Sequence, residues 1–430
     1  MTTPKWDLAV VGIGNMGVSV LGAFLAKGRR CLAVDIDAQK VSEMSRGRSV
    51  VPEESADAVF TKAVAEGRLA ASTELAGVAD AACIFVGVQT PARGDHCDYS
   101  TIQRVLRDLT TRAAPGQPIV VGSTVFPGGI RGSLVGELAS RPDLPLVYQP
   151  VFLRAGFGIE DYLKPGKFLF GLADPSHVPE RMRSLFEAVV EAEPTYVTWE
   201  EAEWIKMVHN AWMAVKITFA NEIDQLCRPF DADARRVLRI AFEENARGRL
   251  MTLSHMMPGP PYSGPCLPKD AVVLGGMVAE HAPKWMGAES ICRALHTSNE
   301  RFIEALVDEW LSRGRESGRA LGVIGTSFRP DFNEMRCSLA LPFIRRARHE
   351  GLTVLGYDPA FEGIDRQSYA LACRGDEELE GLYETVRHPL ETVWRRAGVL
   401  LLNRRLSDGE RQRVRALPRP HVVDVYQNEV

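Results

Sequence analysis

One short loop places a cysteine, a lysine and an aspartate within five residues, namely Cys266, Lys269 and Asp270. Pro268 suits the first helical position, because a helix leaves that N–H without a partner and proline lacks it. The apolar run from Ala271 to Leu274 then indicates the body of a helix. Cys266 is therefore expected at the positive end of a helix with a lysine nearby, which favours the nucleophilic thiolate. The alternative is a buried cysteine that serves as a small apolar side chain.

A lysine and an asparagine form a second candidate pair, on a helix predicted from about Glu200 to Cys227. Lys206 and Asn210 are four residues apart and so share one face of that helix. On an otherwise apolar helix, a buried pair of this kind costs free energy unless it is hydrogen-bonded or used. The alternative is a solvated face. The helix is predicted from apolar residues at intervals of three and four: Trp204, Met207, Val208, Ala211, Trp212, Val215 and Phe219.

The elements that position these groups begin with a dinucleotide-binding fingerprint. An apolar strand, 8–11, leads into a glycine-rich turn and a helix to about Lys27, and a second strand, 31–35, ends in Asp35. The glycines allow a tight turn, close approach to a pyrophosphate and close helix–strand packing, while the acid binds ribose hydroxyls. Asp35 favours NAD over NADP, because a 2′-phosphate would meet its negative charge. A glycine-rich surface turn is the alternative. The turn comprises Gly12, Ile13, Gly14, Asn15, Met16 and Gly17.

Two further strands, predicted at 82–86 and 118–122, are followed by turns that carry Thr90 and Thr124. Ligands of open α/β sheets bind beyond the carboxyl ends of the strands, so both threonines are placed to contact cofactor or substrate. The alternative for each is an ordinary turn-forming threonine.

A second α/β unit is predicted after a helical middle. Strand 321–324, a helix around 339–350 and strand 353–358 repeat the order of the N-terminal unit, and strands at 399–402 and 422–424 follow. The predicted fold class is therefore α/β. We expect an N-terminal Rossmann domain over residues 1–198, a central helical dimerisation region over 199–300, and a C-terminal Rossmann-like domain that binds substrate over 301–430.

The composition, 45% hydrophobic and 25% charged, is that of an ordinary globular protein. The net charge of -4 gives no electrostatic reason to expect nucleic acid or an anionic membrane as partner. The eight cysteines stand singly, without a C-x-x-C pair, so neither a disulfide framework nor a metal site is indicated. We see no signal peptide and no apolar run of membrane-spanning length, and we expect a cytoplasmic protein.

Together these motifs resemble the UDP-glucose/GDP-mannose dehydrogenase family of NAD-dependent nucleotide-sugar 6-dehydrogenases, nearly end to end. Any one match is modest, but six in the family's order are specific. They are the glycine turn with Asp35, Val88–Pro91, Ser123–Val125, Lys206 with Asn210, Ser263–Asp270, and Phe328 through Asp331 to Arg336.

The resemblance implies that a primary alcohol of a sugar nucleotide is oxidised to a carboxylate by two hydride transfers to NAD. It makes Cys266 the nucleophile that traps an aldehyde as a thiohemiacetal and later holds a thioester. Lys206 and Asn210 would stabilise the developing oxyanion. Asp270, with Thr124 holding a water, would move protons.

The resemblance also implies binding residues and a partner. Contacts to NAD are expected from the glycine turn (Gly12, Gly14, Asn15, Met16, Gly17), Asp35, Thr90, Thr124, Lys269 and Arg336. Contacts to the sugar nucleotide are expected from Phe152, Leu153, Arg154, Lys206, Asn210, Tyr262, Gly264 and Arg329. A homodimer through the long central helix is expected, and no metal.

The chain departs from the family at the segment that reads P-E-F-L-R-E-G in its relatives. Val151 and Ala155 replace both glutamates, which in the family activate water for thioester hydrolysis. Valine can neither accept a proton nor hold a water, so an altered endpoint is expected. Prolines in the stretch 258–265, where the family prefers glycine, indicate altered sugar recognition.

Two alternative functions follow from these departures. One is a single-step oxidoreductase, or an epimerase that oxidises and then re-reduces a related sugar nucleotide. The other is a non-catalytic NAD-binding member of the family. The retained Cys266, Lys206 and Asp270 argue against the second, because a dead site has no chemical need for a thiol beside a lysine.

Overall fold

The computed structural model describes residues 4–51, 53, 55–93, 96–154, 156–242, 258–281, 290–328, 335–373, 375–418 and 420–424. The chain divides into two compact units, residues 1–209 (unit 1) and 210–430 (unit 2), and each is described by itself. The division falls inside one helix, α7 (Trp199–Cys227), so this helix contributes residues to both units.

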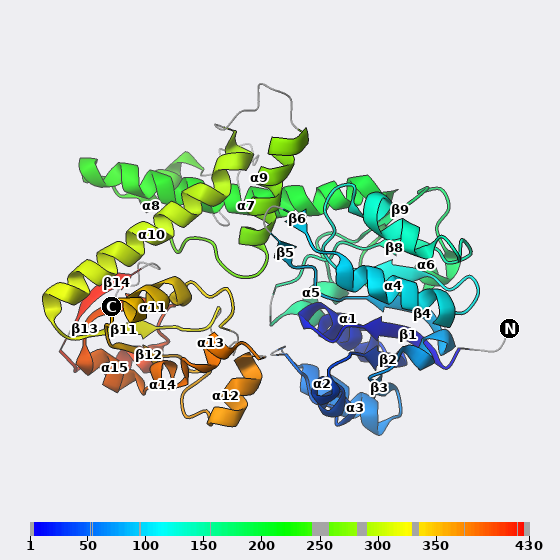
Figure 1. The fold of residues 1–430 in the computed structure, drawn as a ribbon, viewed down its shortest axis with the longest axis horizontal. Helices are drawn as coiled ribbons and strands as arrows, with labels where there is room; N and C mark the ends of the chain where they lie inside the picture. The colour runs from blue at the N-terminus through cyan, green and yellow to red at the C-terminus, as the bar shows by residue number, and fades with distance from the viewer. Residues whose placement is uncertain are drawn as a thin grey trace. The chain divides into compact units, whose positions relative to one another are not determined.

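Unit 1 is built around an eight-stranded sheet with the strand order β10-β9-β8-β7-β4-β1-β2-β3 (Figure 1). The strands from β8 to β3 in that order are parallel, and β9 pairs antiparallel with β8. The strands are β1 (Trp6–Val11), β2 (Cys31–Val34), β3 (Leu69–Ser72), β4 (Ala81–Val86), β7 (Ile119–Val121), β8 (Leu146–Tyr148), β9 (Leu169–Leu172) and β10 (Thr195–Thr198), with β5 (Ala92–Arg93) and β6 (His96–Cys97) as a separate pair.

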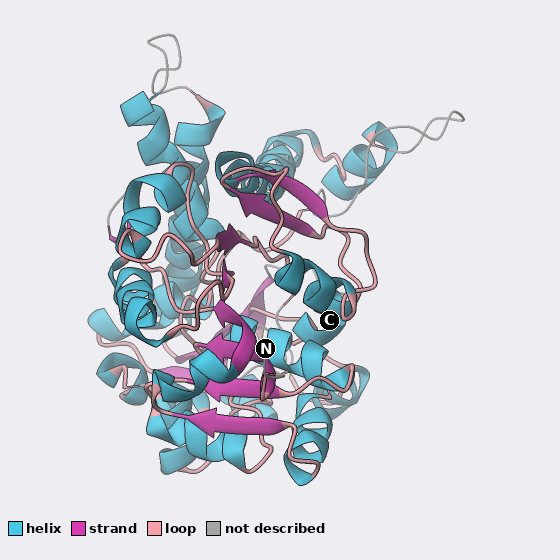
Figure 2. Cartoon of the chain, turned by 90° about the vertical axis from the view of Figure 1, so that its right-hand side faces the viewer, coloured by secondary structure: helices cyan, strands magenta, loops and turns pink. Residues whose placement is uncertain are grey.

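Helices cover both faces of this sheet (Figure 2). Leu8 and Val10 of β1 pack in one hydrophobic cluster, whereas Ala9 and Val11 pack in a second one. A strand buried on both faces is apolar at every position, which explains the continuous apolar run of β1. The helices are α1 (Asn15–Ala26), α2 (Ala38–Ser45), α3 (Ala56–Ala65), α4 (Ser100–Arg112), α5 (Gly158–Leu163) and α6 (Glu180–Glu187), with short 3₁₀ or π helices at Leu75–Asp80, Ile130–Leu134 and Val135–Leu138.

Unit 2 contains a four-stranded parallel sheet with the order β12-β11-β13-β14. Val399 and Leu401 face one cluster and Leu400 and Leu402 the other, so this sheet is also covered on both faces. Its strands are β11 (Ala320–Ile324), β12 (Val354–Tyr357), β13 (Ala397–Leu402) and β14 (His421–Asp424). Its further helices are α8 (Ala234–Ala241), α9 (Leu267–His281), α10 (Ile291–Ser317), α11 (Ala340–His349), α12 (Arg366–Cys373), α13 (Glu377–Glu380), α14 (Tyr383–Val386), α15 (Leu390–Arg396) and α16 (Asp408–Val414), with a 3₁₀ turn at Arg228–Phe230.

The predicted α/β class is confirmed; the sheet of unit 2 is parallel, and that of unit 1 is parallel apart from the β8–β9 pairing. The long helix expected from about 200 to 227 is α7, and every strand expected in the two units is present with its bounds shifted by at most two residues. The helix α10 was not predicted, and the expected domain limit at 300 falls inside it. The two limits between the three expected domains stay predictions.

The orientation of α7 differs from what its apolar pattern suggests. Trp204, Val208 and Trp212 are 44%, 58% and 59% exposed, whereas Asn210 is 7% exposed. The apolar stripe thus faces outward along part of its length and the polar residue faces inward. The pattern of threes and fours predicts a helix, but it does not tell which side the rest of the chain covers. Among the described residues, no helix is long and apolar enough to cross a membrane.

Candidate active site

The three glycines of the N-terminal turn have different surroundings. Gly12 has φ +98°, and a Cβ there would lie 2.8 Å from the Gly87 carbonyl oxygen. A Cβ on Gly17 would overlap the Gly12 carbonyl oxygen, so α1 packs closely on the turn only because this residue is glycine. A Cβ on Gly14 would meet no heavy atom within 4 Å. The open space beside Gly14, at the N-terminus of α1, fits a dinucleotide pyrophosphate.

Asp35 lies directly after β2 and faces the same turn. Its carboxylate accepts the Ile13 N–H at 2.7 Å and the Asp37 N–H at 3.0 Å, and its side chain is 9% exposed. The Lys40 ammonium lies 3.3 Å away. The position suits a ribose-binding acid, but Lys40 offers a positive charge that the sequence interpretation did not consider.

The other expected cofactor residues lie around neighbouring strands of this sheet. Asn15 is exposed and Met16 half-buried, at the start of α1. Thr90 is buried in the segment after β4, and Thr124 is half-buried after β7. The structure therefore brings the expected residues of unit 1 to the carboxyl ends of β1, β2, β4 and β7, where ligands of such sheets bind.

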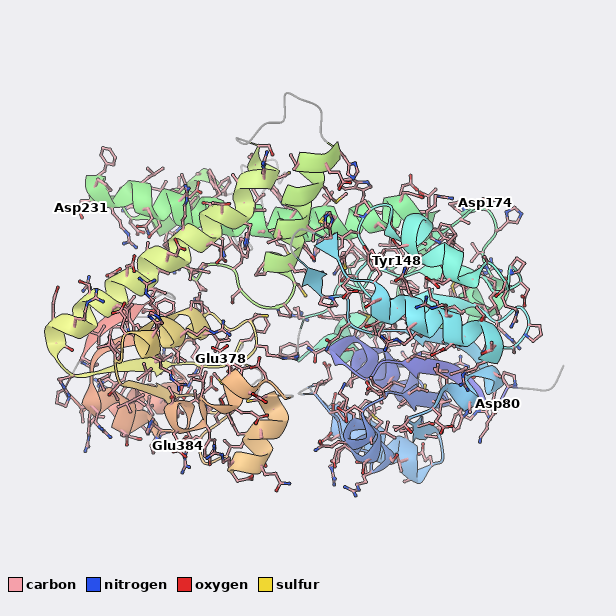
Figure 3. All side chains as sticks on the ribbon, in the orientation of Figure 1. Asp80, Tyr148, Asp174, Asp231, Glu378 and Glu384 are labelled. Atoms are coloured by element: carbon pink, nitrogen blue, oxygen red, sulfur yellow. The ribbon has the colours of Figure 1, made fainter. Side chains whose placement is uncertain are left out.

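The segment that carries Thr124 is fixed by hydrogen bonds from several elements. The Ser123 hydroxyl donates to the Val88 carbonyl at 2.6 Å, which joins the segments after β7 and β4. The hydroxyl oxygens of Tyr148 and Tyr99 accept backbone N–H groups from Val125 at 3.4 Å and Phe126 at 2.9 Å. Tyr148 ends β8 and is labelled in Figure 3. Thr124 thus lies between backbone groups that are held on both sides.

A buried glutamate completes this arrangement. The two carboxylate oxygens of Glu203 accept the N–H groups of Gly128 and Ile130, each at 2.7 Å. Burial raises the pKa of Glu203 to about 7, although these two donors act in the opposite direction. Sequence interpretation missed Glu203. The one available signal was a glutamate three residues before Lys206, on the same side of the helix.

Lys206 is held by the segment 150–156, where the resemblance implies that the chain departs from its relatives. Its Nζ donates to the Val151 carbonyl at 2.7 Å and lies 4.8 Å from the centre of the Phe152 ring. The Val151 side chain itself packs against the hydrophobic core. The backbone of residue 151, and not its side chain, therefore contacts the lysine.

The remaining residues of this segment are placed as follows. Leu153 packs against the core of unit 1. The exposed Arg154 forms a two-pronged ion pair with Asp161, with its Nη2 2.6 Å from Oδ1 and its Nε 3.0 Å from Oδ2. Its guanidinium is thus already engaged by an acid, which the sequence did not indicate. Ala155 lies outside the described residues.

In unit 2, a buried carboxylate organises the cysteine loop. Asp270 is 3% exposed, and its two oxygens accept Nδ2 of Asn210 at 2.5 Å and Nζ of Lys269 at 2.8 Å. Helix α9 begins at Leu267, one residue earlier than predicted, and the Cys266 carbonyl accepts the Asp270 N–H at 2.9 Å. Cys266 is exposed at the start of this helix, as the sequence predicts.

The loop before Cys266 is shaped from inside unit 2. Gly264 has φ +85°, and a Cβ there would overlap the Phe328 ring, so both the backbone conformation and the lack of space require glycine. The Gly264 N–H donates to the Cys337 carbonyl at 2.8 Å. Arg336 is half-buried in the turn before α11, and Arg329 lies outside the described residues.

Tyr262 differs from the other expected substrate contacts. It is 3% exposed, and its hydroxyl donates to the Leu295 carbonyl at 3.0 Å. Its N–H and carbonyl both bond to the Asn299 amide. The phenol therefore supports the loop from within the core and is not exposed for contact with a ligand.

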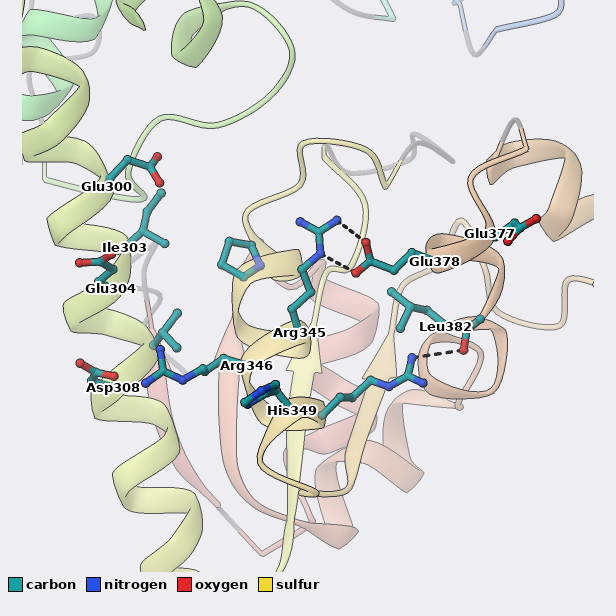
Figure 4. Close-up of a pocket in the computed structure, with 14 residues that line it drawn as sticks. Glu300, Ile303, Glu304, Asp308, Arg345, Arg346, His349, Glu377, Glu378 and Leu382 are labelled. Atoms are coloured by element: carbon teal, nitrogen blue, oxygen red, sulfur yellow. Dashed lines mark hydrogen bonds and ion pairs between the residues drawn. The ribbon is translucent and has the colours of Figure 1, made fainter. Parts of the chain in front are cut away.

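An open groove of about 1120 Å³ lies elsewhere in unit 2, between α10, α11 and α13 (Figure 4). Arg345 forms a two-pronged pair with Glu378 at 2.6 and 2.9 Å, and Arg348 donates to the Gly381 carbonyl at 3.3 Å. None of the expected site residues lines it. Among the described residues, there is also no cluster of three or more side chains able to hold a metal ion.

The parallel sheet of unit 1, its glycine turn and the acid after β2 define the class of Rossmann-type dinucleotide-binding proteins. Comparison with known proteins is more specific. Residues 6–190 match the NAD binding domain of the UDP-glucose/GDP-mannose dehydrogenase family, and residues 200–301 match the central domain of that family.

Two relatives illustrate the similarity. The chain is 28% identical over 389 residues to UDP-glucose 6-dehydrogenase of Rhizobium meliloti, which covers 86% of this chain and 87% of that protein. It is 27% identical over 368 residues to GDP-mannose 6-dehydrogenase of Pseudomonas putida, with coverages of 82% and 80%. A solved structure of a UDP-glucose dehydrogenase from Pyrobaculum islandicum shares the fold, with a TM-score of 0.82, 23% identity and coverages of 99% and 95%.

The chain therefore belongs to the UDP-glucose/GDP-mannose dehydrogenase family. It is an NAD-dependent dehydrogenase that acts on a CH–OH group, and the predicted family, activity class and cofactor are confirmed. The roles of the individual site residues stay predictions.

Replacing Gly17 with alanine should lower the free energy of unfolding by about 2–4 kcal/mol, because the new methyl group overlaps the Gly12 carbonyl oxygen. Gly14→Ala is the matched control for stability, since its Cβ meets no heavy atom within 4 Å. That variant should instead weaken NAD binding by occupying the space beside the helix N-terminus. Thermal melting and NAD titration measure the two effects. Unchanged NAD affinity in Gly14→Ala would contradict the placement of the cofactor.

Asp35→Ala should weaken NAD binding and improve the relative affinity for NADP. The change removes the acid that repels a 2′-phosphate and leaves Lys40 without the carboxylate 3.3 Å away. Asp37→Asn is the control, because asparagine still accepts the N–H groups at the start of α2. Fluorescence titration with both cofactors is the measurement. Equal affinity of the wild type for NAD and NADP would show that Asp35 does not set the preference.

Proposed function

We propose that this protein oxidises the C6 primary alcohol of a UDP- or GDP-hexose by way of a covalent bond to Cys266. The observation that carries the proposal is the exposed Cys266 at the start of α9, one helical turn from the buried Asp270. The names of the relatives, UDP-glucose and GDP-mannose 6-dehydrogenase, support the substrate class.

The chemistry requires two oxidations at one carbon. NAD, when bound, accepts the hydride that leaves this carbon. The alcohol first loses a proton and a hydride and becomes an aldehyde, to whose carbon the Cys266 thiolate adds. The resulting thiohemiacetal loses a second proton and hydride and becomes a thioester. Water then cleaves the C–S bond, which releases the carboxylate and restores the thiol.

The described contacts suit the roles of the neighbouring polar groups. The Lys206 ammonium is held by the Val151 carbonyl, and the Asn210 amide by Asp270, so both donors are oriented before substrate arrives. Such preorganised donors stabilise an oxyanion effectively because they need no rearrangement. Asp270, flanked by Lys269, is a proton acceptor on the same helix turn as Cys266.

The departures from the family bear on the last step. Val151 turns its side chain into the core, so no acid stands there to activate water. We infer slow hydrolysis of the thioester, or a reaction that ends at one oxidation. An epimerase on a related sugar nucleotide is the alternative in which the single oxidation converts a secondary alcohol to a ketone, and NADH then returns the hydride to the other face of that carbon.

We further infer a homodimer through α7. Its outward apolar side chains, Trp204, Val208, Trp212 and Phe219, are between 42% and 59% exposed. Four large apolar side chains exposed along one helix are typical of a protein–protein contact.

The test of the proposed function is NADH formation over a panel of UDP- and GDP-hexoses, with the mass of each product. One compound of the panel should reduce NAD, and Cys266→Ser should abolish carboxylate formation. If the protein binds NAD but forms NADH with none of the sugar nucleotides in the panel, it would instead be a non-catalytic member of the family.

Cys266 should react with iodoacetamide faster than the other cysteines at neutral pH, because it lies at the positive end of α9. Cys337 is the matched comparison, since it is also exposed but does not begin a helix. Burial raises the pKa of Cys83 to about 12, so that thiol should react slowly. Mass spectrometry after brief labelling gives the order. Even labelling of Cys266 and Cys337 would count against the nucleophile role.

Val151→Glu should speed product release if thioester hydrolysis limits turnover. A missing general base costs about 10²–10⁴-fold in rate. The glutamate would supply one because its charged carboxyl group is unfavourable against the apolar core, where the Val151 side chain packs, and would turn away from it. Intact-protein mass spectrometry of the wild type during turnover should show a substrate adduct that is absent from Cys266→Ser. Val151→Leu is the control for altered packing. Rapid wild-type turnover to a carboxylate without an adduct would mean that another group supplies the base.

A further inference from the structure

Glu203 joins the helix that carries Lys206 to the segment that carries Thr124. Glu203 is 1% exposed. One of its carboxylate oxygens accepts the Gly128 N–H and the other accepts the Ile130 N–H, each at 2.7 Å. Two donors on two different oxygens suit an ionised carboxylate. A glutamine would satisfy only one of them, because its second terminal atom is itself a donor.

The position of Glu203 along α7 links two segments of unit 1. Lys206 lies about one turn further on and donates to the Val151 carbonyl at 2.7 Å. Consecutive turns of α7 thus hold the segment after β7, through Glu203, and the segment after β8, through Lys206. These two strands are parallel neighbours, and ligands bind beyond the carboxyl ends of such strands.

We propose that Glu203 is a positioning residue for the oxidation, which fixes Thr124 relative to Lys206 by holding the backbone of Gly128 and Ile130. The inference rests on the proposed function, since Thr124 and Lys206 are groups of that reaction. Glu203 acts through the backbone of the segment and takes no part in the bond changes.

Because these two hydrogen bonds need an ionised carboxylate, the positioning by Glu203 depends on pH. Burial raises its pKa to about 7, and the nearby Glu200 acts in the same direction, whereas Arg131 acts in the opposite one. Tyr99, the other titratable group close by, stays neutral because burial raises its pKa. Above pH 7 the carboxylate holds both N–H groups. Below it the protonated acid offers one acceptor, as glutamine does at every pH.

Glu203→Gln tests the proposal, and Glu200→Gln is the matched control. Glu200 lies one turn earlier on α7 and pairs with Arg131 at 2.6 Å, so it too joins α7 to the segment 128–135, but from the exposed side. With the sugar nucleotide that the wild type oxidises, Glu203→Gln should lower kcat by about five- to hundredfold, the range expected from a small misplacement of reacting groups. Glu200→Gln should change kcat less than about twofold.

Two further readouts separate positioning from a general loss of stability. The ratio of wild-type to Glu203→Gln activity should be largest about one unit above the pKa of Glu203 and should shrink about one unit below it. Hydrogen–deuterium exchange over residues 123–130 should rise in Glu203→Gln and not in Glu200→Gln. Unchanged kcat, or a ratio that does not vary with pH, would overturn the proposal.

A second variant keeps the test open if Glu203→Gln does not fold. Tyr99→Phe removes only the hydroxyl that accepts the Phe126 N–H at 2.9 Å, in the same segment. It should lower kcat in the same direction by a smaller factor, and no decrease would overturn the proposal. A wild type that oxidises no sugar nucleotide contradicts the proposed function instead. In that case the positioning role is tested by hydrogen–deuterium exchange alone. Equal exchange over residues 123–130 in the wild type and in Glu203→Gln would overturn it as well.

Discussion

One physical constraint governs the candidate residues in each of the two units: every buried or half-buried polar side chain on α7 that we single out is hydrogen-bonded. Glu203 accepts two backbone N–H groups, Lys206 donates to a backbone carbonyl, and Asn210 donates to the Asp270 carboxylate. Each contact offsets a desolvation cost that would otherwise oppose burial of the helix. The same contacts fix the segments from which the proposed chemistry is built. Stability and preorganisation therefore have a common origin here.

Much of this site could be predicted from the sequence, because some functions demand particular residue types in a local order. Gly12 and Gly17 are required by the geometry of a turn, and Cys266 precedes a helix whose start the sequence signals. Glu203 could not be predicted in this way, since its partners Gly128 and Ile130 are 75 and 73 residues distant. Such contacts depend on tertiary packing, which leaves no local pattern.

The orientation of α7 and the contacts of residue 151 show a related limit. Periodicity identifies a helix but not its outward side, and here Trp212 faces outward while Asn210 is buried. Valine at position 151 has no side chain that can act as an acid or base, yet its backbone carbonyl holds Lys206. If the family has a glutamate here, as the resemblance implies, the change removes an acid without removing the contact that orients the lysine. Under the proposed function, this combination would leave the oxidation steps intact and weaken the hydrolysis step.

The central claim is that Cys266 carries the substrate through both oxidations and that release of the thioester is slow. The most direct measurement is NADH formation in the first turnover, after enzyme is mixed with excess NAD and the oxidised sugar nucleotide. The account predicts a rapid burst of about two NADH per active site, followed by a slow steady rate. A linear time course from the first turnover, with no burst, would contradict it.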